Sequence, residues 1–201
     1  VEDVWDSMSE RVVDMITFSL RDTKNAKVFV EAKTAIHTFI RTLESFEFSV
    51  SRLNALVLSF FRRFAQLLRE RFAADFQQAI REAQHQPMIV NDATELAKVL
   101  SVCWLKPGEA EQLGKQPFPL SLPFSQTYPL CCMDIRSLVE QYYSFSQGMT
   151  QYHQEIDAIL SQSLDDLLIQ LISVNIRDTV EQSNNLCLLY TSPSPRDVEE
   201  S

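Results

Sequence analysis

Apolar residues recur at alternating steps of three and four in three successive segments, which is the spacing of helices that each bury one side. The first predicted helix ends near Arg21, and the second covers roughly 29–46. The third begins near Val50 and continues to about Ala83, a length of about 50 Å at 1.5 Å per residue. The positions expected to be buried are Trp5, Met8, Val12 and Met15, then Phe29, Ala32, Ile36, Phe39, Leu43 and Phe46, then Val50, Leu53, Val57, Phe60, Phe64 and Leu67, with Phe61, Leu68, Phe72, Phe76 and Ile80 beside them.

Two further helices are predicted in the second half of the chain. A short one starts at Asn91 or Asp92, either of which can act as N-cap, and carries Glu95 in its first turn. The other has the most regular apolar spacing, at Ile135, Leu138, Tyr142, Phe145, Met149, Tyr152, Ile156 and Ile159. After Ile159 the pattern slips by one residue, to Leu160, Leu164, Leu167 and Leu171. This slip predicts a bend or a change of partner within 160–164, and Gly148 is a second weak point.

The six prolines outside the C-terminal tail all lie between Pro87 and Pro129, so no regular helix is expected in most of this region. Four apolar residues alternate with small or proline residues there: Phe118, Leu120, Leu122 and Phe124. An extended chain places such residues on one side, which predicts a strap lying across the helices over 105–130. A proline-rich ligand for an SH3 domain is the alternative, but Pro119 and Pro123 have P-x-x-x-P spacing instead of P-x-x-P.

Glycine is scarce, with three in 201 residues, and the common nucleotide-binding and hydrolase motifs are missing. No G-x-G-x-x-G, G-x-x-x-x-G-K or G-x-S-x-G sequence is present. The formal net charge of −9 argues against nucleic acid as a partner, because contacts to phosphate need a basic surface. The longest nearly apolar stretch, 53–61, is far shorter than the roughly 20 residues of a membrane span.

The end of the sequence differs in composition from the rest. Residues 187–197 read Cys-Leu-Leu-Tyr-Thr-Ser-Pro-Ser-Pro-Arg-Asp, which resembles an in-frame translation of a transposase adapter used in sequencing libraries. We treat 187–201 as a non-native artefact and leave it out of the fold and function prediction, with a Ser-Pro linker or phosphorylation site as the alternative. The chain opens at Val1 without an initiator methionine, so a fragment of a longer protein is expected.

Candidate catalytic and metal-binding residues do not form a recognisable site. Of His37, His85 and His153, only His153 has a carboxylate one helical turn away, that of Asp157, and a third ligand is not evident. The cysteines, which are Cys103, Cys131, Cys132 and Cys187, lack C-x-x-C spacing, so reduced thiols of a cytosolic protein are expected. We assign no catalytic, cofactor-binding or metal-ligating residue and no cofactor. The chain is not predicted to be an enzyme, and a helical enzyme fragment is the remote alternative.

Charge is unevenly distributed along the predicted helices. Four arginines lie close together on the third helix, with Glu70 as the acid among them: Arg62, Arg63, Arg69 and Arg71. Between Ser137 and Ile176 there is no Lys or Arg, and the acidic residues are Glu140, Glu155, Asp157, Asp165 and Asp166. Two solvated faces are the simpler interpretation. The alternative is that the arginines bind an acidic protein or lipid headgroup and the acidic helix binds a basic surface.

The most distinctive segment of the sequence is 116–129, which reads Gln-Pro-Phe-Pro-Leu-Ser-Leu-Pro-Phe-Ser-Gln-Thr-Tyr-Pro. This segment resembles one in the exocyst Sec-fifteen subunit family, also called exocyst complex component six, which has a similarly spaced F-P-x-x-x-P-x-S-Q-x-x-P run. Segments 48–53 and 87–91 upstream and 145–146 and 155–168 downstream resemble family segments in the same order. The resemblance spans roughly Asp3 to Ile176.

Pattern and resemblance together predict an all-α fold, an elongated stacked helical bundle of the rod type with a proline-rich strap. The expected parts are a first part of the bundle at 1–104, the strap at 105–130, and a long helix or two collinear helices at 131–180. The resemblance implies a fragment from the middle-to-C-terminal part of the subunit.

The function implied by the resemblance is that of a non-catalytic rod module in a subunit that tethers secretory vesicles to the plasma membrane before fusion. Other exocyst subunits are the expected partners. The subunit is expected to act as part of a Rab GTPase effector, with the GTPase site mainly beyond Ile176 and outside this fragment. The implied location is cytoplasmic and peripheral at secretory vesicles and the plasma membrane. The alternative is a binding module that itself contacts a small GTPase or an acidic lipid.

Overall fold

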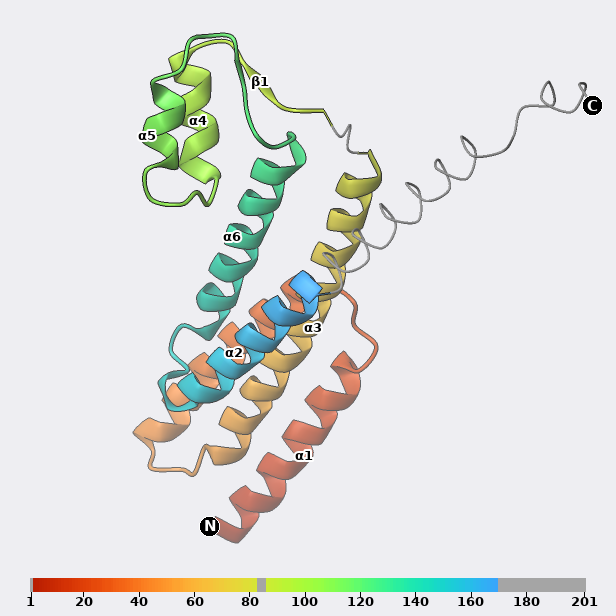
Figure 1. Cartoon of the computed structure of the whole chain (residues 1–201). Coiled ribbons are helices and arrows are strands. Elements are labelled where there is room, and N and C mark those ends of the chain that lie inside the picture. The colour runs from red at the N-terminus through yellow and green to blue at the C-terminus, as the bar shows by residue number, and fades with distance from the viewer. Residues whose placement is uncertain (1, 83–85, 170–201) are drawn as a thin grey trace, which may run out of the picture.

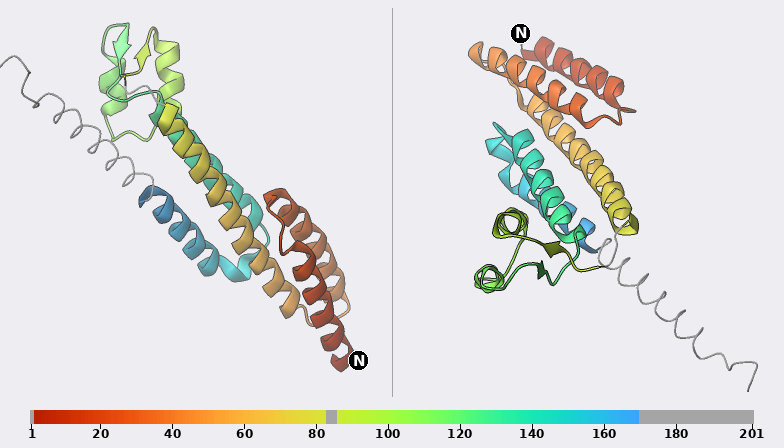
Figure 2. Two further views of the ribbon diagram at one scale, coloured as in Figure 1. Left: turned by 90° about the vertical axis from the view of Figure 1, so that its right-hand side faces the viewer. Right: turned by 90° about the horizontal axis from the view of Figure 1, so that it is seen from above.

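Helix α3 is the element on which the other long helices are assembled (Figure 1). The computed structural model describes residues 2–82 and 86–169, and α3 covers Ser51–Glu82, about 48 Å at 1.5 Å per residue. Helices that pack directly on α3 include α1 (Glu2–Leu20), α2 (Ala26–Ser45) and α6 (Thr127–Ser146). The all-α class and the long third helix are confirmed, and Figure 2 shows the long helices aligned along one axis.

The starts of two helices are fixed by side chains that satisfy backbone N–H groups. Asn25 accepts a hydrogen bond from the backbone N–H of Lys27 and caps α2. At α4 (Ala93–Val102), the Asp92 carboxylate accepts from the N–H of Glu95 at 2.8 Å, and the Glu95 carboxylate accepts from the N–H of Asn91 at 2.8 Å. Asp92 is thus the N-cap, and Glu95 satisfies the N–H of the residue before it, which confirms the helix start predicted from the sequence.

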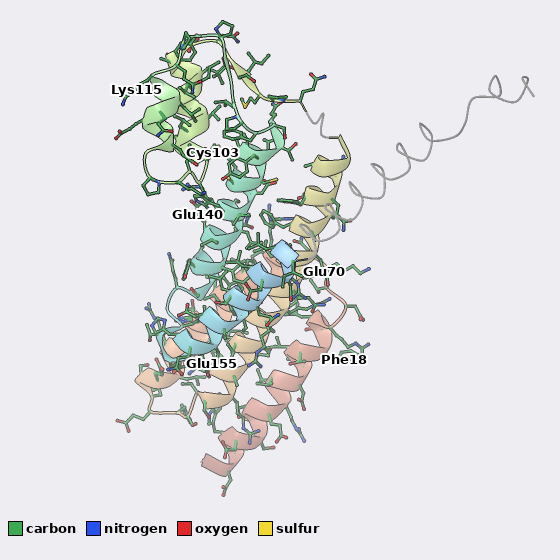
Figure 3. The ribbon with its side chains drawn as sticks, in the orientation of Figure 1. Phe18, Glu70, Cys103, Lys115, Glu140 and Glu155 are labelled. Atoms are coloured by element: carbon green, nitrogen blue, oxygen red, sulfur yellow. The ribbon has the colours of Figure 1, made fainter. Side chains whose placement is uncertain are left out.

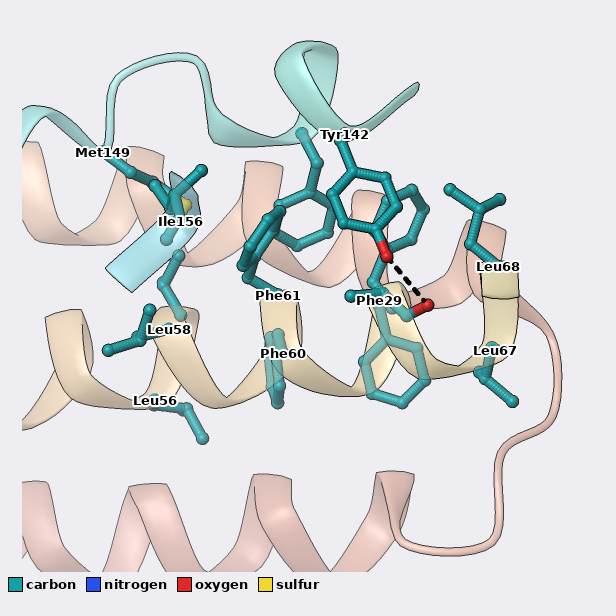
Figure 4. Close-up of a cluster of buried hydrophobic side chains, with 14 of the residues drawn as sticks. Phe29, Leu56, Leu58, Phe60, Phe61, Leu67, Leu68, Tyr142, Met149 and Ile156 are labelled. Carbon is teal, nitrogen blue, oxygen red and sulfur yellow. Dashed lines mark hydrogen bonds between the residues drawn. The ribbon is translucent and has the colours of Figure 1, made fainter. Parts of the chain in front are cut away.

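The main apolar core lies between α3 and the helices that pack on it, with aromatic rings at its centre (Figure 4). Phe64 stacks on Phe145 with ring centroids 4.7 Å apart, and Phe61 meets Tyr142 edge-on at 5.7 Å. These rings are almost completely buried, which stabilises the fold by roughly 1.5–3 kcal/mol for each side chain. The predicted core positions of α3 from Leu53 to Phe72 are all buried.

On two helices, the apolar side predicted to face the core differs from the side that does so in the structure. On α1, Met8 and Met15 are exposed, whereas Trp5 packs on the core as predicted, beside three residues outside the predicted stripe: Val13, Ile16 and Leu20. On α2, Phe39 is exposed and Ile40 is buried in its place, because the buried side turns by one residue in the last turns of the helix. Phe46 follows the end of α2 and is also exposed.

A small second unit with its own core sits at one end of the bundle (Figures 1 and 2). It consists of a two-stranded antiparallel sheet, α4 and a short helix, with β1 at Ile89–Val90, β2 at Leu120–Ser121 and α5 at Glu109–Gly114. Its buried side chains are Val90, Leu96, Val99, Cys103, Leu120 and Leu122. Helix α4, which the sequence analysis placed with the first part of the bundle, contributes to this second core.

The strap region departs from the sequence prediction in three ways. Helix α5 forms within 105–130, because Pro107 and Pro117 lie outside its six residues. The strap packs against α4 and β1 and not across the long helices, since Leu120 and Leu122 are buried in the second core. Phe118, expected to be buried with them, is 37% exposed.

The segment predicted as a long helix or two collinear helices is a helical hairpin. Helix α6 ends at Ser146, Gly148 has a φ of 83°, a 3₁₀ turn (η1) follows at Thr150–Tyr152, and a helix then covers 153–169. Figure 1 shows this last helix running back beside α6. The chain therefore reverses at the glycine, while helix 153–169 has no break within 160–164. Predicted core position Leu171 and the tail 187–201 lie outside the described residues.

Candidate functional site

The arginine cluster of α3 makes internal contacts with the acidic segment that follows α6. Nη1 of Arg69 lies 2.6 Å from Oδ2 of Asp166 on helix 153–169, and about one third of each side chain is exposed. The other oxygen of Asp166 accepts a hydrogen bond from the amide of Gln162 at 2.8 Å. Arg69 of the arginine cluster and Asp166 of the acidic segment thus form an ion pair within this chain.

The other arginines of the cluster differ in the internal hydrogen bonds that their guanidinium groups make. Arg71 donates to the side-chain carbonyl of Gln141 on α6 at 3.2 Å. Arg63 donates to a glutamine on its own helix, and Arg62 has no hydrogen-bond or ion-pair partner among the described residues. Arg62 and Arg69 line a groove of about 360 Å³ between α3 and helix 153–169. Arg62 and Arg63 are therefore the members of the cluster that remain open to an acidic partner.

The remaining acidic residues form a solvated face. Glu140, Glu155, Asp157 and Asp165 are exposed, and Figure 3 shows Glu140 and Glu155 on the outside of the hairpin. His153 is exposed as well, and no set of three metal-ligating side chains occurs within residues 2–82 and 86–169. His85 lies outside the described residues.

Tyr142 is a buried polar group that joins three helices (Figure 4). Its O–H donates to the backbone oxygen of Ala65 on α3 at 3.2 Å, and the buried Ser163 of helix 153–169 lies beside the same side chain. Burial raises the pKa of Tyr142, and the polar Ser163 side chain and the charge of Arg69 offset part of this rise. The phenol is therefore neutral under ordinary conditions, and its role is structural.

The three described cysteines, Cys103, Cys131 and Cys132, are free thiols, and burial keeps Cys103 and Cys131 in their protonated form. Burial raises the pKa of Cys103, and the neighbouring thiol of Cys132 adds to the rise. Burial, with the charge of Asp134 second, raises the pKa of Cys131 to about 12. Because the thiolate is the nucleophile and the metal ligand, Cys103 and Cys131 are unreactive. Cys187 lies outside the described residues.

Two concave sites appear that the sequence analysis did not identify. An open cleft of about 470 Å³ lies between α5 and the start of α6, with aromatic side chains of Trp104, Phe124 and Tyr128 in its wall. A groove of about 360 Å³ lies between α2 and the turn after α6, and it is lined by Lys33, His37 and Arg41. The spacing of these three residues, at steps of four, was a signal in the sequence for one shared helix face. The turn at Gln147 and Gly148 could not be placed beside them from the sequence.

The comparison with family models gives one match, to the description "Exocyst complex subunit Sec15 C-terminal", over residues 52–189. This match covers more than half of the chain and includes α3, the second unit and the α6 hairpin. It ends at residue 189, within the tail that the sequence analysis set aside.

Known proteins with similar sequences carry related names. The chain is 24% identical over 186 residues to exocyst complex component SEC15 of Saccharomyces cerevisiae, covering 90% of this chain and 20% of the yeast protein. It is 24% identical over 172 residues to exocyst complex component 6 of Rattus norvegicus, covering 86% of this chain and 21% of the rat protein. The match to exocyst complex component sec15 of Schizosaccharomyces pombe is 26% identical over 145 residues, or 72% of this chain and 18% of the relative.

The chain spans about a fifth of the length of these relatives. No solved structure matches the chain. Within the part of the chain that the structure describes, no helix is both long enough and apolar enough to cross a bilayer.

Proposed function

The chain belongs to the exocyst complex subunit Sec15 family, and from this premise we propose that it is a non-catalytic rod module of a vesicle-tethering subunit. In this proposal the module stacks end to end with further helices of the same subunit and holds apart the surfaces that bind other proteins. The α3-centred bundle supports this role, because a helix of about 48 Å covered by packed neighbours makes a stiff spacer.

The observation that carries the proposal is the second apolar stripe of α1. Val4, Met8, Met15 and Phe18 are 55–70% exposed, and they lie beside the stripe that packs on α3. Figure 3 shows Phe18 on the outer side of the helix. Apolar side chains therefore cover more than half of the circumference of α1, which is typical of a helix with packed neighbours on two sides. Since the relatives are about five times longer than this chain, we propose that another helix of the same subunit covers this stripe.

The wider role follows from the family and is part of the proposal. The subunit would tether secretory vesicles to the plasma membrane together with other exocyst subunits, in the cytoplasm and at the membrane periphery. It would act within a Rab GTPase effector, with the GTPase site outside this chain. Two arginines of the cluster are already occupied inside the chain, Arg69 by the ion pair with Asp166 and Arg71 by the hydrogen bond to Gln141, which supports the spacer over the alternative of a GTPase-binding module.

A chimera tests the rod module. In yeast SEC15, this chain replaces the matching segment, and the chimera is purified with its exocyst partners. We expect the chimera to co-purify with the other subunits. We expect the double substitution Met8→Glu and Phe18→Glu to abolish this co-purification, because it places two charges in the α1 stripe that another helix of the subunit would cover. Asp14→Lys, on the same helix outside both stripes, is the matched control and should have no effect. Equal assembly of the double variant and the control would refute the packed stripe.

A pulldown tests the placement of the GTPase site. The chain is presented to a panel of Rab GTPases loaded with GDP or a non-hydrolysable GTP analogue, after circular dichroism has confirmed helical folding. We expect no GTP-selective capture. Capture that is lost on charge reversal of Arg62 and Arg63 would instead support the binding-module alternative.

A further inference from the structure

The groove between α2 and the turn after α6 is basic in a chain that is acidic as a whole. Lys33, His37 and Arg41 line it from α2, and Gln147 and Gly148 line it from the turn. The chain has a formal net charge of −9, yet no carboxylate lines this groove. Such a local reversal of charge is the arrangement that concentrates an anionic ligand.

The three basic residues form one row along α2. Their spacing of four residues places them on the same helix face with neighbouring Cβ atoms about 5–6 Å apart, and the row from Lys33 to Arg41 is about 12 Å long. The hydroxyls of Thr34 and Thr38 already donate to backbone oxygens of their own helix, at 2.9 and 3.1 Å. The basic side chains are therefore the side-chain hydrogen-bond donors that remain available to a ligand in the groove.

Lys33 is held in place while donors remain free. Its Nζ donates to the backbone oxygen of Gln147 at 2.7 Å and lies 5.6 Å from the centre of the Phe145 ring. An ammonium group has three N–H bonds, so two remain. His37 and Arg41 have no hydrogen-bond or ion-pair partner among the described residues. The groove thus holds one fixed cation and two side chains with unused donors.

Gly148 shapes the floor of the groove beside His37. Its φ of 83° suits glycine, and a Cβ at this position would lie 3.1 Å from Nε2 of His37. The absence of a side chain keeps this edge of the imidazole close to the turn and open toward the groove. Glu31 and Glu44 are the nearest acids along α2, and neither lines the groove.

We propose that this groove binds a phosphorylated inositol headgroup that carries at least two phosphate groups. A row of about 12 Å is longer than one phosphate needs, whereas two or three phosphates on one ring can meet several of its cations. The groove volume of about 360 Å³ is in the range of small-molecule sites. A peptide with a single phosphoserine would use only part of the row. Diffuse attraction to an acidic bilayer is opposed by the net charge of the chain.

Binding measurements on the full chain distinguish the sources of this headgroup. One arm titrates soluble inositol hexakisphosphate by calorimetry. A second measures flotation with phosphatidylcholine vesicles that contain a phosphatidylinositol bisphosphate, and a third uses vesicles of equal negative charge made with phosphatidylserine. We expect binding in the first two arms and at least tenfold weaker binding to phosphatidylserine. Binding of the soluble compound alone would assign the groove to a free inositol phosphate.

Variants locate the binding in the groove. We expect Arg41→Gln and His37→Gln each to weaken binding about tenfold, while Arg62→Gln, which removes an exposed and unpartnered arginine on α3, has no effect. Circular dichroism shows that each variant folds. Equal loss in Arg62→Gln and Arg41→Gln, equal binding to phosphatidylserine vesicles, or binding only to a phosphoserine peptide would each overturn the proposal. Absence of binding in every arm would overturn it as well.

Discussion

Tyr142 explains why the apolar spacing of the last helix looks irregular in the sequence. The strict repeat after Ile159 requires an apolar residue at 163 and finds Ser163, which suggested a slip of the stripe to Leu160 and Leu164. In the structure the buried positions are Ile156, Leu160, Ser163 and Leu167, with Ser163 beside the Tyr142 side chain, so the helix stays regular. The apparent mismatch is one half of a polar pair, and a single sequence does not reveal its other half.

Removal of the Tyr142 hydroxyl tests this contact. Tyr142→Phe removes the buried hydrogen bond to Ala65 and leaves that backbone oxygen without its partner, so we expect a loss of about 1–3 kcal/mol in the free energy of unfolding. Tyr143→Phe, at the next and half-exposed position, should change it by less than about 0.5 kcal/mol. Urea unfolding of both variants gives the comparison, and equal stability of the two would contradict the assignment.

Helices α3 and α6 bring two carboxyl groups together, Asp75 and Asp134. Burial, with the charge of Asp75 second, raises the pKa of Asp134. A raised pKa means that the folded state prefers the neutral acid. Its contribution to stability is therefore complete below the unfolded pKa of about 4 and is lost as pH rises through the higher folded value.

This electrostatic contact predicts a pH-dependent stabilisation. Asp134→Asn should be more stable than the natural sequence at neutral pH, because the substitution removes a charge that is partly buried near another. The difference should shrink as pH falls toward about 4, where the acid is protonated in both states. Urea midpoints across this range measure it, with Glu140→Gln on the exposed side of α6 as the control. A difference that is independent of pH would show that packing, and not charge, is responsible.

Most helices could be predicted from the chemistry of neighbouring residues. Which side of a helix packs against which neighbour could not be predicted in this way. The capping residues Asp92 and Glu95 and the core positions of α3 depend on neighbouring sequence, and they were identified correctly. Helix α1 carries two adjacent apolar stripes, and nothing within its sequence says which one faces α3. The stripe with Met8 and Met15 was chosen, but the other one packs on the core, where its side chains are half-buried. Helix α5 was missed because the prolines on both sides were taken to exclude the residues between them.

The hairpin and the basic groove could not be predicted either, because both depend on contacts between residues far apart in the sequence. The spacing from Ile135 to Ile159 continues through Gly148, because both arms of the hairpin present their apolar side to the bundle. A continuous stripe therefore does not distinguish a straight helix from a folded one. The row from Lys33 to Arg41 is visible in the sequence, but its groove is completed by a turn more than 100 residues away.

The two separate cores predict that the molecule does not unfold in one step. Leu122 is almost fully buried in the second core, so Leu122→Ala should cost about 2–5 kcal/mol within that unit. Amide hydrogens of α4 should then exchange faster, while those of α3 keep their protection. Phe118→Ser, at a partly exposed position of the same strap, should have a much smaller effect. Equal acceleration in α3 and α4 would indicate a single cooperative unit.

The pairing of β1 with β2 has a consequence for how this family can vary. Because paired strands lie about 4.8 Å apart, the chain enters and leaves the second unit at nearly the same point. The unit is therefore an enlarged connection between α3 and α6, and its ends can be joined by a short turn without moving either helix. Insertions, deletions and grafted binding domains should be tolerated there in evolution and in engineering, while the helical spacer keeps its length.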